Sequence, residues 1–597
     1  MIAHRERVRR VSGSVARHRL RRGACALGVA LGGWCALAGP GRASAASPQA
    51  IAAARAATPE AGDRAGDPRP WDDPLYVVAA PDQGFLGNED VRDAFARFRE
   101  TVPRSALWFV TREQALETLE AALAGLAPPA DGSGIVVLPL FMTAHHALYE
   151  RARAALAGRP VRWASPLGES YLAEEMLFRR VAAVSRDPGR EHLVLIGTGA
   201  DSDEAAARVR ASLGPLAGRA ARKLGLAGAE VLALRDESAG PEARESSFAA
   251  VAERAREVEG EGRTALVIPF GHARHLTMMM SDWSGLGRRL SATSARYEPR
   301  AVLPDEIAET WLLRAATEHR GLDPSEVGVI LVPHGADFHW NETMRRGIAP
   351  LRGDYVTEDA FSMVDPPLVE RAVRKLEAKG MKAAVLVRIF GLESSFREKT
   401  EYVLGLSRDP DLAHDHMGIP ERIVTPLELH TLGGIEDSPH LADALADRIA
   451  EVSEAPSRET VILLAHGAAS EEDNDHWLDL LERLADRIDE KTGGRYRGFA
   501  WDTWREDWPE QRDAAVARIR GLVRRAGAEG TALVIPVRTA GRGPAAEYLS
   551  GLEYREGTGF APHPAFTAWL RETIDRGIEE IRRPGSRPGT GRSSTGR

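Results

Sequence analysis

Four short hydrophobic segments, each ending in a polar residue and a turn, lie at similar intervals along the chain. Each segment is apolar on both faces, which is typical of a strand covered by helices on both sides of a parallel sheet. The polar residues at their ends are Asp82, Thr198, His334 and His466, at intervals of 116, 136 and 132 residues. A similar interval repeated three times indicates duplication of whole lobes rather than of short repeat units.

A second hydrophobic segment follows near the middle of each repeat, after an amphipathic helical stretch and a Gly-containing turn. Strands that alternate with amphipathic helices indicate βαβ units and a small parallel sheet. We therefore predict an α/β fold of four repeated lobes, each a small parallel sheet flanked by helices, paired as two bilobal modules. The predicted lobes are residues 73–188, 189–322, 323–456 and 457–585.

The first 45 residues have a different character from the rest of the chain. An arginine-rich start precedes the apolar run "GACALGVALGGWCALAG" and the small residues Ala43–Ala45. This order predicts a cleaved export signal, and hence a periplasmic or extracellular protein. The alternative, an uncleaved anchor helix, is disfavoured because the run is short and Gly-rich. Residues 46–72 and 586–597 are predicted to be a disordered leader and a disordered tail.

Cysteine usage and charge narrow the possible functions. Cys25 and Cys35 both lie in the predicted signal, so the mature chain would have no thiol for a disulfide, a Cys zinc site or a nucleophile. The formal net charge is −8, and it becomes −16 when the nine arginines and one glutamate of residues 1–45 are removed. Such acidity argues against nucleic acid as a partner. We also expect no stable membrane insertion after signal cleavage, and, in the absence of a nucleotide-binding loop, no nucleotide cofactor.

Several segments resemble the class II tetrapyrrole chelatases, the sirohydrochlorin cobaltochelatases and ferrochelatases. "VILLAHGA" and "VILVPHGADFHWNE" are similar to that family's first strand and loop, "VVLPLFMTAHH" to the strand that carries a second histidine, and "EGTGFAPHPAFTAWL" to its closing segment. The resemblance covers nearly all of residues 75–581. It implies a bilobal α/β fold that binds a tetrapyrrole in a cleft and inserts a divalent metal, namely cobalt, iron or nickel, as a substrate.

The resemblance also implies site residues. His334 and His466 match the first-strand histidine, so we expect them to line a cleft between the third and fourth lobes, to bind the metal and to accept pyrrole protons. His146 and His275 match the second histidine and are expected as further metal ligands. Glu393 is expected to be catalytic as a proton relay. No single lobe carries both histidines, so the usual pair would have to be assembled from different lobes.

Three functions stay open at this point. The first is an exported chelatase that acts on sirohydrochlorin or a related tetrapyrrole. The second is a non-catalytic protein that holds haem, another tetrapyrrole or a divalent metal, and both export and the divided histidines favour it. The third is a structural protein that has lost its ligands. His339 and His476, each followed by a Trp, are either ligands or residues at a helix start beside a packed aromatic ring.

Overall fold

The structure is a computed structural model that describes residues 74–126, 134–273, 276–277, 280–408 and 419–582. The predicted signal, leader and tail, and His275, lie outside the described residues.

Four sheets, each of four strands, form the framework of the chain. The first contains β1 (Leu75–Pro81), β2 (Ser105–Val110), β3 (Ile135–Pro139) and β4 (Arg162–Trp163), and the second β5 (Glu191–Ala200), β6 (Gly228–Arg235), β7 (Thr264–Pro269) and β10 (Arg296–Tyr297). The third contains β11 (Val327–Pro333), β12 (Thr357–Asp359), β13 (Ala383–Ile389) and β14 (Glu428–Gly433), and the fourth β15 (Glu459–Ala465), β16 (Gly498–Thr503), β17 (Thr531–Val537) and β18 (Arg555–Glu556). The described residues also include a short antiparallel hairpin, β8 (Leu276–Thr277) with β9 (Met280–Ser281).

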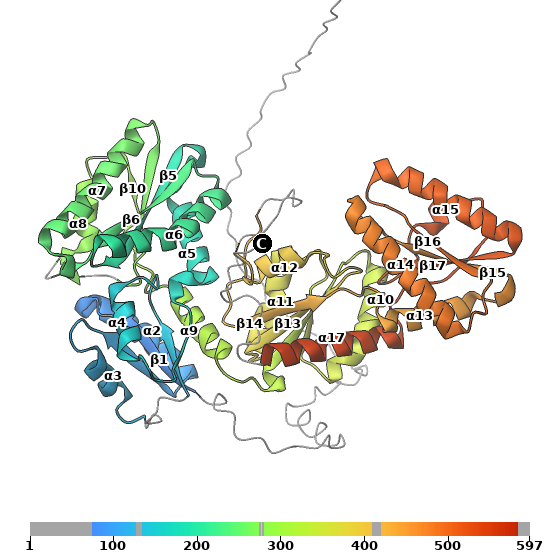
Figure 1. Cartoon of the computed structure of the whole chain (residues 1–597), viewed down its shortest axis with the longest axis horizontal. Coiled ribbons are helices and arrows are strands. Elements are labelled where there is room, and N and C mark those ends of the chain that lie inside the picture. Colours follow the sequence, from blue (N-terminus) through green and yellow to red (C-terminus); the bar gives the residue numbers. More distant parts are fainter. Residues whose placement is uncertain (1–73, 127–133, 274–275, 278–279, 409–418, 583–597) are drawn as a thin grey trace, which may run out of the picture. The chain divides into compact units, whose positions relative to one another are not determined.

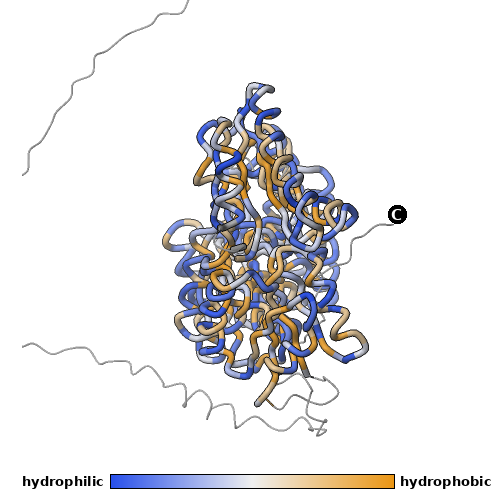
Figure 2. The backbone as a smooth tube through the Cα atoms, turned by 90° about the vertical axis from the view of Figure 1, so that its left-hand side faces the viewer, coloured by the Kyte–Doolittle hydropathy of each residue, from blue (hydrophilic) through white to orange (hydrophobic). Residues whose placement is uncertain are grey.

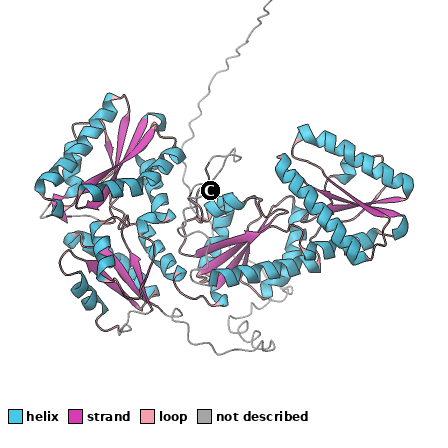
Figure 3. Ribbon diagram, viewed as in Figure 1, coloured by secondary structure: helices cyan, strands magenta, loops and turns pink. Residues whose placement is uncertain are grey.

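All four sheets have the same topology. In sequence order within each lobe, the strands lie as second, first, third, fourth, and every neighbouring pair is parallel. Helices surround the strands of every lobe (Figure 3). The predicted fold class, a repeated α/β lobe with a small parallel sheet, is therefore confirmed. The lobe boundaries given above fall between these sheets and remain our assignment.

In the described part of the chain, four α-helices accompany each sheet. They are α2 (Gly84–Thr101), α3 (Ala115–Leu123), α4 (Ala147–Ala155) and α5 (Tyr171–Val184) in the first lobe, and α6 (Asp203–Leu224), α7 (Pro241–Gly260), α8 (Asp282–Leu290) and α9 (Glu306–Glu318) in the second. The third lobe has α10 (Phe338–Ile348), α11 (Pro366–Ala378), α12 (Arg397–Val403) and α13 (Pro439–Val452), and the fourth α14 (Glu471–Thr492), α15 (Pro509–Glu529), α16 (Ala545–Tyr548) and α17 (Pro564–Arg582). In three lobes a side chain caps the helix that follows the first strand, because Ser202, Asp337 and Ser470 each accept a backbone N–H of the first turn.

The two faces of each sheet contribute to different cores. Along β1, Tyr76, Val78 and Ala80 belong to a core that also contains strands of the second lobe, whereas alternate residues face a core confined to the first lobe. The same division holds for the third and fourth lobes, whose inner faces share one core. In Figure 2 hydrophobic stretches of the backbone alternate with hydrophilic ones along the whole tube, as the alternation of buried strands with amphipathic helices and turns requires. Lobes 1 and 2 are therefore one bilobal module, and lobes 3 and 4 are another.

Reciprocal exchange of the last helix of each lobe joins the two lobes of a module. Helix α5 ends the first lobe but packs on α6 and β7 of the second, while α9 ends the second lobe and packs on α2 and β3 of the first (Figure 1). The Tyr76 hydroxyl donates to the Ala316 carbonyl across this contact at 2.8 Å. In the other module α13 packs on α14 and β17, and α17 packs on α10, β13 and β14.

The two modules share a buried glutamate at the same position, the start of the first strand of their second lobe. Glu191 begins β5 and Glu459 begins β15, and both side chains are almost fully buried. Each carboxylate accepts two backbone N–H groups, a serine hydroxyl and an arginine; the side-chain partners are Ser185 and Arg296 in the first module, and Ser453 and Arg555 in the second. Burial alone would raise the pKa of each carboxyl, but these hydrogen bonds outweigh it and hold both pKa values below their usual range.

The exchanged helix α17 should be essential to the stability of the second module. Phe566 on α17 is fully buried, and its ring lies over Gly347 of α10, where an added Cβ would come within 2.8 Å. Phe566→Ala should therefore lower the free energy of unfolding by about 3–5 kcal/mol, as large-to-small changes in a packed core do. Denaturant unfolding measures this. Phe85→Ala, at a side chain that is 74% exposed, is the control, and an unchanged midpoint for both variants would contradict the role of the exchanged helix.

Candidate functional site

The first strand of lobes 3 and 4 ends in the same His-Gly turn. Gly335 and Gly467 follow the histidines with φ of +81° and +86°, a region that favours glycine. The turn directs each glycine carbonyl back to its histidine: His334 Nδ1 lies 2.7 Å from the Gly335 oxygen, and His466 Nδ1 lies 3.0 Å from the Gly467 oxygen. Because a carbonyl only accepts, Nδ1 carries the hydrogen in both rings.

A hydrogen on Nδ1 determines the state of the other ring nitrogen, Nε2. A neutral imidazole that is protonated at Nδ1 presents the lone pair of Nε2, the atom that can bind a metal ion or accept a proton. His334 is exposed, and its ring meets Phe390 edge-on. The His466 side chain is 35% exposed. Both histidines therefore stand at carboxyl ends of parallel strands, where open α/β sheets bind ligands.

Acidic residues surround His466, on the loop that follows β16. Its Nε2 lies 3.0 Å from a carboxylate oxygen of Asp507 and 4.0 Å from one of Glu506. Trp508 meets the ring edge-on at 5.5 Å. Both ring nitrogens of His466 thus face acceptor oxygens. Either a hydrogen on each nitrogen or a cation bound between Nε2 and Asp507 would satisfy these oxygens.

Glu393 lies on the loop after β13, and its side chain is half-exposed. Its carboxylate pairs with Arg397 at 2.8 Å and lies 3.8 Å from Arg388. Within the described residues, neither His334 nor His466 is among its partners. The structure therefore places this predicted relay in an ion pair, without a direct contact to either strand-end histidine.

Glu436 connects the loops of lobes 3 and 4 at this edge. Its carboxylate accepts the backbone N–H of Glu393 at 2.5 Å and lies 3.0 Å from Nε2 of His476, in the first turns of α14. The neighbouring Trp477 packs over Gly391, where a Cβ would come within 2.4 Å of the indole. His476 therefore ties one lobe to the other, while His339 is exposed at the start of α10.

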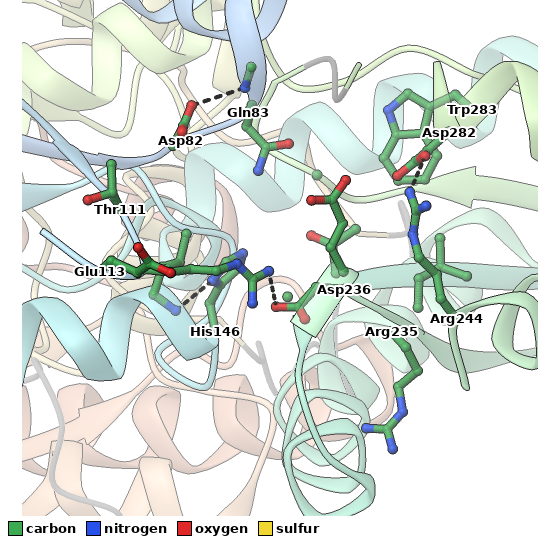
Figure 4. Close-up of a pocket in the computed structure, with 18 of the residues that line it drawn as sticks. Asp82, Gln83, Thr111, Glu113, His146, Arg235, Asp236, Arg244, Asp282 and Trp283 are labelled. Atoms are coloured by element: carbon green, nitrogen blue, oxygen red, sulfur yellow. Dashed lines mark hydrogen bonds and ion pairs between the residues drawn. The ribbon is translucent and has the colours of Figure 1, made fainter. Parts of the chain in front are cut away.

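The first module contains a pocket of about 580 Å³ between its two lobes. Its wall consists of residues at the carboxyl ends of strands from both sheets: Asp82 after β1, Arg112 after β2, Thr198 on β5 and Asp236 after β6. His146, at the start of α4, and Trp283, on α8, complete it (Figure 4). The volume is within the range of small-molecule sites.

His146 has the opposite tautomer from His334 and His466. It is the N-cap of α4, and its Nδ1 accepts the backbone N–H of Leu148 at 3.2 Å. The ring lies against lobe 2, because a Cβ at Gly199 would come within 2.0 Å of its Cδ2. In the neutral ring Nδ1 is thus the acceptor and Nε2 bears the hydrogen. This arrangement does not suit the predicted role of His146 as a metal ligand, since neither nitrogen has a free lone pair.

Ion pairs lie around the pocket, one between the two lobes and others within lobe 2. Arg112 of lobe 1 reaches Asp236 of lobe 2 at 3.1 Å, and Arg244 meets Asp282 on the lobe 2 side at 2.5 Å (Figure 4). Arg235 points away from Asp236 in the same view, and it pairs with Asp203 at the start of α6. The Arg112–Asp236 pair therefore spans the two lobes at the pocket.

Among the described residues, no group of three or more His, Cys, Asp or Glu side chains is arranged to hold a metal ion. Within the same residues, no helix has the length and apolar character that a membrane span requires.

Sequence reasoning missed the pocket of the first module, although a signal for it exists. The segment "TRE" at 111–113 follows β2 directly, and "RDE" at 235–237 begins on the last residue of β6. The strand-end rule that selected the four first-strand residues applies equally to these second strands.

Comparisons with known proteins found similarity only at the level of solved structures. No protein-family model matches it, and no curated protein matches it. Among solved structures it is similar to DR2241 from Deinococcus radiodurans, described as a multi-domain protein with structural similarity to chelatases and two additional novel domains. The identity is 18% and the TM-score 0.31, over 43% of this chain and 56% of that protein, so the match spans little more than half of DR2241. The fold assignment rests on the four sheets themselves.

The buried His146 should make the first module sensitive to acid. Burial, its largest influence, lowers the pKa of His146 from 6.5 to about 4. The unfolded chain therefore takes up this proton at a higher pH than the folded chain, and stability falls as the pH decreases from 6.5 to 4, by about 3 kcal/mol in total. His146→Asn keeps an acceptor for the Leu148 N–H and removes the titration.

Denaturant unfolding at pH 7 and at pH 5 measures this effect. The wild-type free energy of unfolding should fall more between the two values than that of His146→Asn. His145→Asn, at the neighbouring position, is the control and should keep the wild-type dependence. Equal dependence in wild type and His146→Asn would show that the ring is not buried in neutral form.

Proposed function

We propose that the second module, lobes 3 and 4, is a chelatase that inserts cobalt or iron into sirohydrochlorin or a related tetrapyrrole, with His334 and His466 as metal ligands and proton acceptors. One observation carries the proposal: in both His-Gly turns the glycine carbonyl takes the Nδ1 hydrogen, which makes Nε2 the atom that can bind a metal ion or a proton, and in His466 this atom faces the Asp507 carboxylate at 3.0 Å. Histidines that bind metals commonly donate their other N–H to a backbone carbonyl or a carboxylate in this way.

Metal insertion has two chemical requirements that these residues match. The divalent ion, a substrate here, must be held loosely enough to be transferred, which one or two imidazoles do better than a closed site of four ligands. The two pyrrole protons must be taken up by a base, and neutral imidazole can accept them near neutral pH. Asp507 and Glu506 beside His466 can share the ion or receive the proton.

Glu393 completes this proposal as the group that passes protons to solvent. It stands half-exposed on the loop after β13, and Arg397 holds its carboxylate. Its backbone N–H is fixed by Glu436, which also contacts His476, so a chain of polar groups crosses from lobe 3 to lobe 4 beside the strand ends.

A second candidate is an exported, non-catalytic protein that binds a tetrapyrrole or a divalent metal on the same fold. The tautomer of His146 favours it for the first module, because that histidine is engaged in capping α4 and does not offer a lone pair. The two candidates differ in whether metal enters the macrocycle faster with the protein than without it.

The chelatase proposal predicts loss of activity in the double variant His334→Ala, His466→Ala. Purified protein, sirohydrochlorin and Co²⁺ or Fe²⁺ are mixed, the absorbance change of insertion is followed, and the uncatalysed rate is subtracted. Wild type should exceed the background, and the double variant should fall to it. His430→Ala is the control, since His430 lies in the first half of β14, before the carboxyl end of the strand, and pairs with Glu580 near the end of α17.

Acidification should slow the reaction, because a protonated imidazole can neither bind a metal ion nor take a pyrrole proton. If the tetrapyrrole binds tightly but metal insertion is no faster than the background at every pH tested, the chelatase proposal is wrong and the binding-protein candidate takes its place.

A further inference from the structure

We infer that Glu436 is a positioning residue of the second module, which holds the loop 390–396 of lobe 3 against helix α14 of lobe 4. The inference rests on the proposed function, since each of these two segments lies beside one of the strand-end histidines. The loop 390–396 begins with Phe390, whose ring meets that of His334 edge-on, and α14 follows the turn that contains His466. Glu436 thereby gives both histidines a common support.

The backbone of Glu436 has a conformation that its residue type disfavours. Its φ is +50°, in the left-handed region that glycine adopts without strain and other residues rarely enter. The other non-glycine residues with positive φ in the described part of the chain are Val364, Phe396 and Arg505, which also lie on loops after strands of the second module. Such conformations persist where the surroundings impose them, and they gather at functional sites. A glutamate at this position indicates that its side chain is needed there.

The Glu436 carboxylate bridges the two lobes, with one oxygen directed to each. Oε1 accepts the backbone N–H of Glu393 in lobe 3 at 2.5 Å, and Oε2 lies 3.0 Å from Nε2 of His476 in lobe 4. Because an ionised carboxylate only accepts, Nε2 of His476 carries the hydrogen. Gly434 allows the loops to approach this closely, since a Cβ there would come within 2.3 Å of the Glu393 Cα. Both oxygens of the carboxylate are thus used by the bridge.

Backbone hydrogen bonds connect Glu436 to the residue beside His334. The N–H groups of Ile435 and Glu436 donate to the carbonyls of Phe390 and Gly391 at 2.9 and 2.8 Å. The Phe390 ring then contacts the His334 ring, with 6.4 Å between the ring centroids. A shift of Glu436 would therefore be transmitted through Phe390 to His334.

The neighbouring residue, Asp437, provides a comparison within the same loop. Its carboxylate pairs with Arg483 and Arg487 of α14, at 3.0 Å in each case. Within the described residues, the Asp437 side chain has no contact with the loop 390–396. Asp437 therefore helps to dock α14 on lobe 3, whereas Glu436 joins α14 to the loop beside His334.

The test uses the mature full chain and Co²⁺ alone, with the affinity measured by calorimetry. Glu436→Gly fits the left-handed backbone but removes both contacts of the carboxylate. It should bind Co²⁺ about ten-fold more weakly than wild type, the low end of the loss that follows mutation of residues supporting metal ligands. Glu436→Gln keeps the length of the side chain, an oxygen for the Glu393 N–H and a polar group for His476, and it should restore most of the affinity.

Asp437→Asn is the matched control, because it removes the ion pairs with α14 and leaves the bridge in place. It should bind Co²⁺ as wild type does. Denaturant unfolding verifies that each variant is folded. If Glu436→Gly does not fold, His476→Ala replaces it with the same expected loss, since it removes one end of the bridge at a half-exposed side chain.

Two results would overturn the inference alone. One is Co²⁺ binding that is unchanged in Glu436→Gly and His476→Ala, and the other is an equal loss in Asp437→Asn. If wild type binds no Co²⁺, or if the His334→Ala, His466→Ala variant binds it as wild type does, the proposed metal site itself is wrong and the inference falls with it. The wild type and the double variant therefore separate failure of the proposed function from failure of the role of Glu436.

Discussion

The exchange of terminal helices between paired lobes is the constraint on which the rest of the structure depends. A four-stranded sheet of this size has one face covered by its own helices and a second face that must be buried elsewhere. Each lobe buries that second face in a core shared with its neighbour, and helices α5, α9, α13 and α17 close the two shared cores. Since the exchanged helices hold both sheets, the strand ends of a module are positioned together, and both candidate sites lie at strand ends.

The same backbone supports opposite chemistry in the two modules. In lobes 3 and 4 a histidine at the end of the first strand donates Nδ1–H to the next glycine carbonyl, so Nε2 is the candidate ligand atom, which in His466 faces the Asp507 carboxylate. In lobe 1 the histidine lies after the third strand, caps a helix through Nδ1, and leaves an N–H instead. The tautomer, which depends on one backbone contact, therefore separates a possible metal ligand from a hydrogen-bond donor. This difference supports a division of roles between the modules.

Sequence patterns predicted the strands because those strands are buried on both faces, and a buried strand leaves a continuous hydrophobic run. The repeat spacing then predicted four lobes. The tautomer of His146 could not be predicted, because it depends on Leu148 N–H and on the approach of Gly199 from another lobe. The Arg112–Asp236 ion pair could not be predicted either, since it joins loops that are distant in sequence. The buried glutamates Glu191 and Glu459 could have been noticed, because "SRDPGRE" and "SEAPSRE" place them after the same serine, proline and arginine.

The most direct test of the division between modules is a crystal of the mature chain soaked in Co²⁺ and measured at the cobalt absorption edge. Anomalous scattering locates the ion without reference to activity. The account predicts a cobalt peak at bonding distance, about 2 Å, from Nε2 of His334 or His466, and none at His146. A peak on His146, with none at either His-Gly turn, would contradict it.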